Sequence, residues 1–410
     1  MRQIIVHGKI YSLTTPRPPR RGQEMAQHSI IDDGALVIEH GIILAVGPTK
    51  RILTDFGADA HLVDAGGCLV VPGFVDCHTH LPFAGWRADE YRQRLMGHTY
   101  QEMGKLGGIA RSGRQLLESP DEDVMVFCER LTKEMLESGT TTIEMKSGYG
   151  LSLEGELRQL RLIQEFRHRL RQRITATGLF LHAVPENTTK EKWLWEVENE
   201  LLPQAHQRQW LDAVDVFVET SAFSPDEAQG YLRKAREMNL NIRVHSDQFS
   251  HFGGTALALE LGARGIDHLD HIGTQDIIQF QNSNSVAVLL PGATYSLNHK
   301  PYPPARNLID RNIAVALASD FNPGTSPISS MPLIMSMAVH FFGLSPEEAL
   351  SASTINPAYV LGLEHEVGSL EVGKRADVLI LDTNTLETIP YRAGHNPVHR
   401  VFVHGNLMRH

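Results

Sequence analysis

Eight short apolar segments that alternate with helix-like segments constrain the fold of this chain more than any other feature of its sequence. They are rich in branched aliphatic residues, and amphipathic stretches such as 121–138 and 224–239 separate most of them. The eight segments span residues 68–80, 140–150, 174–185, 213–220, 241–248, 265–272, 285–292 and 314–322. Parallel strands joined by helices give this pattern, and eight is the number at which such a sheet closes into a TIM barrel. The sequence therefore predicts an α/β fold with a (β/α)8 barrel. An open doubly wound sheet is the alternative, but no GxGxxG motif follows the first strand.

The two ends of the chain have a different pattern, with short β-rich segments broken by glycine. Residues 3–13 and 35–48 are of this kind near the N-terminus, and residues 368–382 and 399–408 near the C-terminus. Because the two ends are alike, we expect them to pair into one small composite β-sandwich domain. The predicted domains are residues 1–64 with 360–410 for the composite domain, and 65–359 for the barrel.

Composition excludes several classes of protein. The net charge is −10, which does not favour a nucleic-acid or anionic-membrane partner. The three cysteines form no CxxC pattern, so a disulfide framework is not expected and a reducing cytoplasm fits. No apolar run is long enough to span a bilayer, and the N-terminus has no signal-peptide pattern.

Histidine and aspartate residues stand at the carboxyl ends of the predicted strands, where a barrel of this kind gathers its reactive groups. His78 and His80 end the first strand, and residues two apart on a strand share a face. Alone, the pair also fits a strand with two satisfied histidines or a solvated turn. His245 and Asp320 end later strands, however, and three imidazoles with one carboxylate suit Zn²⁺ or Fe²⁺ better than Ca²⁺ or Mg²⁺. The sequence therefore predicts a metal site at the barrel mouth.

Several longer motifs are more specific than these separate residues. The stretches PGFVDCHTH (72–80), VHSDQ (244–248) and ASDFNPGTSP (318–327) resemble the amidohydrolase superfamily. Together with SGTTTIEMKSGYG (138–150) and VAVLLPGATYSL (286–297), they resemble the imidazolonepropionase family of histidine-degrading hydrolases. The resemblance covers the whole chain and is strongest between residues 72 and 330.

This resemblance implies a cofactor, a substrate and a set of site residues. It implies one Zn²⁺ or Fe²⁺/Fe³⁺ per subunit, a small-molecule substrate and a homodimer. The implied metal ligands are His78, His80, His245 and Asp320, and the implied substrate contacts are Arg87, Tyr149, His182, Gln248, Asn322, Gly324 and Thr325. Binuclear barrels of this type carry a carboxylated lysine on strand four. Here strand four ends in Glu219, whereas Lys146 lies on strand two, so we expect a single metal and an ion pair for Lys146.

The implied reaction is the hydrolysis of the ring amide of 4-imidazolone-5-propanoate to N-formimidoyl-L-glutamate. A metal-activated water is expected to attack the carbonyl, and Asp320 to carry its proton to the leaving nitrogen. We expect His268 to hydrogen-bond the nucleophile or the oxyanion, His182 to polarise the carbonyl, and Gln248 to contact the amide–amidine edge.

Further residues of the set are expected to bind the rest of the substrate. Arg87 offers a planar fork to the propanoate, and Tyr149 offers a hydroxyl. The backbone N–H groups of Gly324 and Thr325 are interpreted as a small anion-binding nest.

Three positions depart from the family pattern. Leu106 replaces a glycine, Ser152 stands where an acid is expected, and Ser246 stands where alanine is commoner. None of the three removes a predicted ligand or substrate contact.

Two other functions compete with this one. A deaminase of the same superfamily would act on a neutral heterocycle, but such a substrate needs no carboxylate clamp. A catalytically inactive barrel serving as a scaffold would be expected to lose metal ligands, whereas all four are present here.

Overall fold

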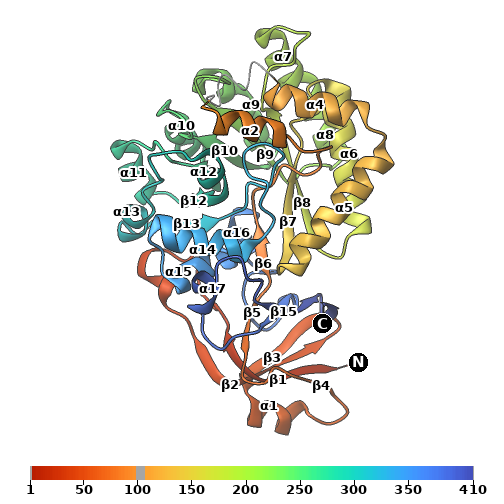
Figure 1. The fold of residues 1–410 in the computed structure, drawn as a ribbon, viewed down its shortest axis with the longest axis vertical. Coiled ribbons are helices and arrows are strands. Elements are labelled where there is room, and N and C mark those ends of the chain that lie inside the picture. The colour runs from red at the N-terminus through yellow and green to blue at the C-terminus, as the bar shows by residue number, and fades with distance from the viewer. Residues whose placement is uncertain (1, 98–106, 410) are drawn as a thin grey trace.

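The structure, a computed structural model, describes residues 2–97 and 107–409, and it contains two separate sheets. In Figure 1 the wider part of the molecule is a barrel of strands surrounded by helices, and the narrower part is a small sheet that holds both chain ends. The predicted barrel and the predicted pairing of the two ends are both confirmed. The exact domain boundaries, at 64/65 and 359/360, stay a prediction.

The barrel is an eight-stranded parallel sheet in which each strand pairs with the next along the chain. Its strands are β6 (Phe74–Asp76), β7 (Thr140–Lys146), β8 (Arg173–Leu181), β9 (Ala213–Val218), β10 (Asn241–Ser246), β11 (Gly265–His268), β12 (Val286–Leu289) and β13 (Ala314–Leu317). Nearly all their residues are buried, as expected for parallel strands covered on both faces.

The first predicted strand is divided between the two sheets. Residues 68–80 contain β5 (Leu69–Pro72), which belongs to the small sheet, and β6, which opens the barrel. The hydrogen bonds change partner between adjacent residues, since the N–H of Gly73 donates to Asp377 and that of Phe74 to Gly139. Both pieces are apolar and buried, so hydrophobicity alone does not show the division.

The barrel closes between its first and last strands just beyond the ends of β6 and β13. Thr79 and Phe321 form a parallel bridge there. The Asp320 N–H donates to the His78 carbonyl at 3.0 Å, and the His80 N–H donates to the Phe321 carbonyl at 2.9 Å. The closing seam therefore fixes the backbones of three predicted metal ligands relative to one another.

The small sheet is mixed and is built from both ends of the chain. Its order is β16-β15-β14-β5-β1-β2-β3, with β4 also paired to β1. The remaining bounds are β1 (Gln3–Tyr11), β2 (Ile30–Glu39), β3 (Ile42–Pro48), β4 (His61–Asp64), β14 (Val378–Leu381), β15 (Val398–Val403) and β16 (Asn406–Arg409). Buried aliphatic side chains from both ends, such as Ile5, Leu36 and Val378, share one cluster that holds the sheet together.

Most helices cover the outside of the barrel, whereas α1 (Thr49–Phe56) packs against β2 and β3 of the small sheet. The described ones are η1 (Gly22–Ala26), α1 (Thr49–Phe56), α2 (Ala88–Leu95), α4 (Gly108–Glu118), α5 (Asp121–Glu137), α6 (Leu153–Arg169), α7 (Lys190–Glu196), η2 (Val197–Leu201), α8 (Leu202–Gln207), α9 (Pro225–Glu237), α10 (Gly254–Leu261), α11 (Thr274–Gln281), α12 (Pro291–Leu297), α13 (Ala305–Asp310), α14 (Met331–Phe342), α15 (Pro346–Ala352), α16 (Ile355–Val360) and α17 (Thr388–Tyr391). The start of α9 is a capping box, in which Ser224 and Glu227 each accept a hydrogen bond from the other's backbone N–H.

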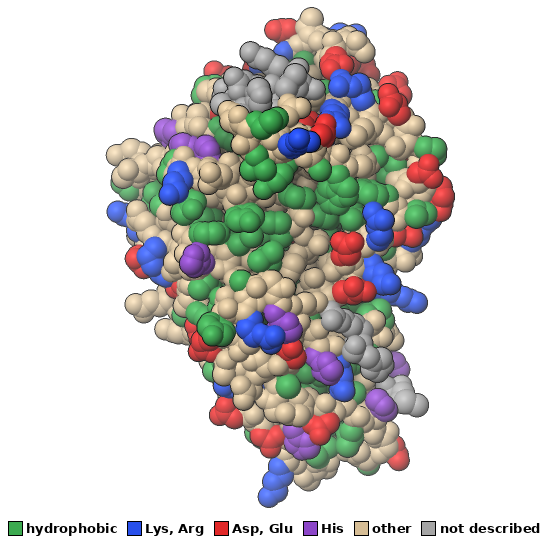
Figure 2. Space-filling model, viewed as in Figure 1, with side chains coloured by type: hydrophobic (Ala, Val, Ile, Leu, Met, Phe, Trp, Pro, Cys, Tyr) green, Lys and Arg blue, Asp and Glu red, His purple; other side chains and the backbone are tan. Residues whose placement is uncertain are grey.

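In the described part of the chain, no helix combines the length and the apolar character needed to cross a bilayer. On the face in Figure 2, hydrophobic side chains gather over the middle of the barrel part, with charged side chains of both signs around them.

Candidate metal centre and active site

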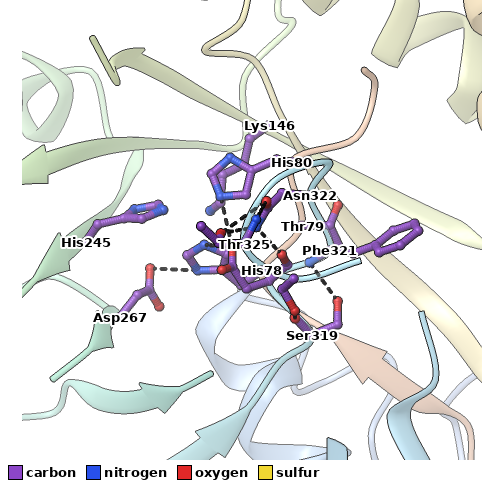
Figure 3. A network of polar contacts seen from close by, with 12 residues as sticks. His78, Thr79, His80, Lys146, His245, Asp267, Ser319, Phe321, Asn322 and Thr325 are labelled. Carbon is purple, nitrogen blue, oxygen red and sulfur yellow. Dashed lines mark hydrogen bonds and ion pairs between the residues drawn. The ribbon is translucent and has the colours of Figure 1, made fainter. Parts of the chain in front are cut away.

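Four side chains converge at the carboxyl end of the barrel strands. His78 and His80 follow β6, His245 lies near the end of β10, and Asp320 follows β13. The His78 and His245 rings lie 4.4 Å apart, centroid to centroid. The Asp320 Oδ1 atom lies 3.1 Å from His80 Nε2 and 3.5 Å from His78 Nε2. The structure therefore brings together the four ligands predicted from three distant parts of the sequence, of which Figure 3 labels His78, His80 and His245.

This arrangement fits a metal ion. One ring nitrogen from each of His78, His80 and His245 lies within 4.8 Å of the others. The Nε2 atom of His245 is buried and accepts no hydrogen bond from any residue that the structure describes. A buried lone pair of this kind is costly unless something binds it. Three imidazoles and one carboxylate are a donor set typical of Zn²⁺ or iron.

Burial disfavours the charged form of His78 and His80, and the neutral imidazole is the form that binds a metal. It lowers the pKa of His78 and His80 well below the ordinary histidine value, and the nearby charges of Lys146 and His245 act in the same direction. Burial also lowers the pKa of His268 to about 3, although Asp320 opposes this shift. The pKa of Asp320 is raised by its burial, and His268 and His245 partly offset the change.

A buried ion-pair network lies behind two of the metal ligands. It consists of Glu144, Lys146, Asp215, Arg243 and Asp267, all with no solvent exposure. Its contacts run His78–Asp267 (3.3 Å), Asp267–Arg243 (2.8 Å), Arg243–Glu144 (3.2 Å), Glu144–Lys146 (2.7 Å), Lys146–Asp215 (2.8 Å) and Asp215–His245 (3.0 Å). Each end of the network thus places a carboxylate at the Nδ1 of a metal ligand. A carboxylate in this position orients the imidazole and directs its Nε2 toward the metal.

The charges of this network explain why it can exist inside the barrel. It contains three carboxylates and two cations, so one negative charge is in excess. Asp320 adds a second, and a divalent cation at the four ligands would balance both. The buried charges and the metal site therefore form one electrostatic unit.

Lys146 is held by ion pairs, as predicted. Burial and Arg243 lower its pKa, but Asp215 and Glu144 outweigh them, so the pKa is raised overall. The ammonium therefore stays charged, and its position on β7 makes it a counter-ion to the carboxylates.

A small cavity opens beside the ligand residues. Its lining includes most of the predicted substrate contacts, namely Arg87, Tyr149, His182, Gln248, Asn322 and Thr325, together with His268, Ile109 and Phe217. Residues from separate parts of the chain thus meet in one small space next to the His/Asp cluster.

Arg87 is the cation of this cavity, and its side chain is almost fully buried. The contact with Glu90 is loose, at 3.6 Å. Gly324 leaves the room that the guanidinium occupies, because a β-carbon at this position would lie 1.6 Å from an Arg87 nitrogen. The lack of a side chain at Gly324 is therefore needed for the position of Arg87. The N–H of Gly324 does not contact Arg87 and donates to Asn322 instead.

The predicted anion-binding nest at Gly324 and Thr325 is wrong. Both backbone N–H groups donate to the side-chain oxygen of Asn322, at 2.9 and 2.7 Å. The Asn322 amide nitrogen in turn donates to the Asp320 carbonyl at 2.6 Å. An asparagine side chain readily closes such a turn and competes with an external anion for the same donors. The turn instead fixes the backbone after Asp320.

Residues 147–151 form the loop that contains Tyr149, and the side chain of Glu156 in the first turns of α6 holds this loop in place. The Glu156 carboxylate accepts from the N–H groups of Gly148 and Leu151, at 2.8 and 3.0 Å. Burial raises the pKa of Glu156 to about 7, although the hydrogen bonds that it accepts pull the value down. The Tyr149 N–H donates a further hydrogen bond to the side-chain oxygen of Gln159 at 3.0 Å. One buried carboxylate thus shapes the loop that carries a predicted substrate contact.

Glu156→Gln is expected to change how stability depends on pH. The folded-state pKa of about 7 lies above the value near 4.3 of an unfolded chain, so the folded state binds more protons between these limits. Stability from this group is therefore greatest at low pH and falls as pH rises toward 7, by about 3–4 kcal/mol. The variant should lack this fall in urea unfolding measured from pH 5 to 8. The exposed Glu154→Gln on the same helix is the control, and the same pH profile in Glu156→Gln and the unmodified chain would contradict the assignment.

The departures from the family pattern have separate outcomes. Leu106 lies outside the described residues. Ser152 caps α6, since its hydroxyl accepts from the Gly155 N–H at 3.0 Å, a role in which serine and aspartate are equivalent. The buried Ser246 hydroxyl lies 3.1 Å from that of Thr255.

Sequence reasoning missed the ion-pair network apart from Lys146, and it missed Glu156. A signal for the network exists, because Asp215, Arg243 and Asp267 each directly follow an aliphatic residue inside a predicted strand. Charged residues at such positions are rarely buried unless they are paired.

Comparisons with known proteins agree with this geometry. The model of the amidohydrolase family matches residues 69–408. The chain is 40% identical to the imidazolonepropionase of Symbiobacterium thermophilum, over 99% of this chain and 97% of that protein. It is 39% identical to the imidazolonepropionase of Solibacter usitatus, over 98% and 96% of the two chains.

Solved structures support the fold. An adenosine deaminase from Xanthomonas campestris with bound zinc aligns with a TM-score of 0.73 and 16% identity, over 99% of this chain and 92% of the other. The Escherichia coli guanine deaminase aligns with a TM-score of 0.71 and 18% identity, over 100% and 99%. At these identities the likeness concerns the fold alone. The family match and the near full-length identity to curated relatives place the chain in the amidohydrolase family and, within it, among the imidazolonepropionases.

Proposed function

We propose that the chain hydrolyses the ring amide of 4-imidazolone-5-propanoate and releases N-formimidoyl-L-glutamate. The observation that carries this proposal is the buried Arg87 guanidinium in the same small cavity as the His/Asp cluster. A guanidinium there suits a substrate with a carboxylate tail, whereas a neutral nucleobase offers it no negatively charged partner.

The side chains of the cavity divide the work. The four ligands would hold Zn²⁺ or iron, which supplies Lewis acidity and makes water nucleophilic near neutral pH. Asp320 accepts the proton of the attacking water and delivers it to the ring nitrogen as the C–N bond breaks. Burial lowers the pKa of His268 to about 3, so its imidazole is neutral. It hydrogen-bonds the attacking water or the oxygen of the tetrahedral intermediate. Gln248 binds the amide–amidine edge, and the Tyr149 hydroxyl assists Arg87 at the tail.

Three further properties belong to the same proposal. The site holds one metal ion per subunit, the chain forms a homodimer, and it works in the cytoplasm. Elemental analysis and light scattering on the purified protein test the first two.

The activity is tested by turnover of the substrate. Imidazolone propanoate should lose its ultraviolet absorbance when the metal-loaded protein is added, with formimidoylglutamate as the product. Release of ammonia from guanine or adenosine in place of this reaction would favour a deaminase. A folded chain that takes up no zinc or iron would favour a scaffold.

Arg87→Ala is expected to raise KM about 10- to 100-fold with a smaller effect on kcat, because the variant loses charge-assisted hydrogen bonds to the propanoate. Steady-state kinetics measure both constants. Arg92→Ala, an exposed arginine on the neighbouring α2, is the matched control. An unchanged KM in Arg87→Ala would remove this residue from the carboxylate site.

A further inference from the structure

One hydrogen bond fixes which nitrogen of His182 carries a proton. Its Nδ1 atom lies 3.0 Å from the carbonyl oxygen of Gly148. A carbonyl oxygen only accepts hydrogen bonds, so Nδ1 is the nitrogen that bears hydrogen. In a neutral ring, Nε2 then carries a lone pair and is the nitrogen left for a molecule in the cavity that His182 lines.

The peptide that carries the Gly148 carbonyl is held in this orientation by its own N–H, which is that of Tyr149. This N–H donates to the Gln159 side-chain oxygen at 3.0 Å, a bond that a flipped peptide would lose, and the Gln159 amide nitrogen is engaged with the Pro82 carbonyl at 2.8 Å. Gly148 has a φ of +117°, and a β-carbon on it would lie 2.9 Å from the Leu179 carbonyl and 3.1 Å from His182 Nδ1. Glycine is therefore required here, and the carbonyl stays directed at His182.

The His182 ring lies between a metal ligand and the cavity. It stacks on the ring of His80 with centroids 5.2 Å apart and planes at 28°. Arg87 lines the same cavity, together with three of the ligand residues, His80, His245 and Asp320. Arg87 already supplies the cation of this cavity, so the role left for the His182 ring is that of a neutral hydrogen-bonding group.

We propose that His182 is a hydrogen-bond acceptor that selects the substrate tautomer in which the ring nitrogen remote from the carbonyl carries hydrogen. The inference rests on the proposed function, and it replaces the carbonyl-polarising role expected from the sequence. The Nε2 atom of such an imidazole carries no proton, so it cannot donate to a carbonyl oxygen, but it can accept a hydrogen bond from a ring N–H.

The selected tautomer suits the bond changes of hydrolysis. With hydrogen on the remote nitrogen, the amide nitrogen next to the carbonyl keeps a lone pair. Water adds its oxygen to the carbonyl carbon, the bond from that carbon to the amide nitrogen breaks, and this nitrogen takes one proton. It becomes the terminal imine N–H of the formimidoyl group, while the N–H bound by His182 passes unchanged into the product. The ring nitrogen next to the carbonyl can therefore accept the proton that Asp320 delivers.

The protonation pattern is tested by NMR without any turnover. Zinc-loaded, full-length protein labelled with ¹⁵N-histidine should show His182 with a protonated Nδ1 and an unprotonated Nε2 in long-range ¹H–¹⁵N spectra. The signals of His182 are those lost in His182→Phe. A protonated Nε2 would overturn the proposal and would leave the proposed activity standing.

A pair of inhibitors tests the consequence for recognition. Hydantoin-5-propanoate carries an N–H at the ring nitrogen next to the side chain, and its N1-methyl derivative lacks it. Methylation should weaken inhibition about tenfold or more in the unmodified enzyme and less than threefold in His182→Phe. His299→Phe, outside the cavity, is the control and should behave like the unmodified enzyme. An equal cost of methylation in the unmodified enzyme and in His182→Phe would refute the acceptor role, whereas failure of both compounds to bind any of the enzymes would count against the proposed substrate itself.

Discussion

Asp320→Ala should lower kcat by roughly 10³-fold or more, because one side chain serves both as a metal ligand and as the group that moves the proton. The residue sits at the closing seam, where its backbone N–H donates to the His78 carbonyl whatever the side chain. The fold should therefore survive, as judged by circular dichroism and the thermal midpoint.

Asp320→Asn separates the two roles of this residue. Asparagine keeps the shape and an oxygen ligand but cannot carry the proton. We expect near-normal zinc content by elemental analysis, with kcat still lowered at least about 10²-fold. The exposed Asp310→Asn is the control for the charge change. Substantial turnover in Asp320→Asn would refute the proton-transfer role and leave only metal binding.

Lys146→Met should produce the largest loss of stability and should also weaken metal binding. It removes one of two cations from the network and leaves Glu144 and Asp215 without their ammonium partner at 2.7 and 2.8 Å. Breaking a buried pair in this way costs about 3–5 kcal/mol. Asp215 also holds the His245 Nδ1 at 3.0 Å, so a displaced Asp215 should loosen that ligand.

The matched control for this variant is Lys133→Met on α5. That lysine forms an exposed pair with Glu137 at 4.0 Å, and such pairs contribute little. Urea unfolding and competition for zinc with a chromophoric chelator measure the two effects. If Lys146→Met were as stable as Lys133→Met and bound zinc equally well, the network would be no support for the metal site.

The parts of the structure that follow from sequence are those governed by local pattern. The eight barrel strands are visible as apolar segments, and the ligands are visible because strand ends meet at one edge of a parallel barrel. The start of α9 is equally local, since Ser224 and Glu227 make a capping box within one turn. The strands and the helix start depend on residues close together in the chain, whereas the ligands are far apart in it and follow from the common edge at which the strands end.

What the sequence did not reveal depends on pairing across the fold. Asp215, Arg243 and Asp267 are on three strands, and only the closed barrel shows that they join His78 to His245. The nest prediction failed for a related reason, because a side chain two residues before Gly324 took its N–H. The sequence motif alone does not show whether the Gly324 N–H donates to the Asn322 side chain or to an external anion.

The position of the closing seam has a consequence for the newly made protein. The backbone hydrogen bonds that join the first and last barrel strands involve His78, His80 and Asp320. A nascent chain that has been synthesised only as far as β12 therefore contains the first two imidazoles but cannot yet close the barrel around them. A metal ion could bind to all four ligands only after synthesis has passed residue 320, because Asp320 is the last of them in the chain. An ion held there would link His78 and His80 after the first barrel strand to Asp320 after the last, and so would reinforce the closure of the barrel.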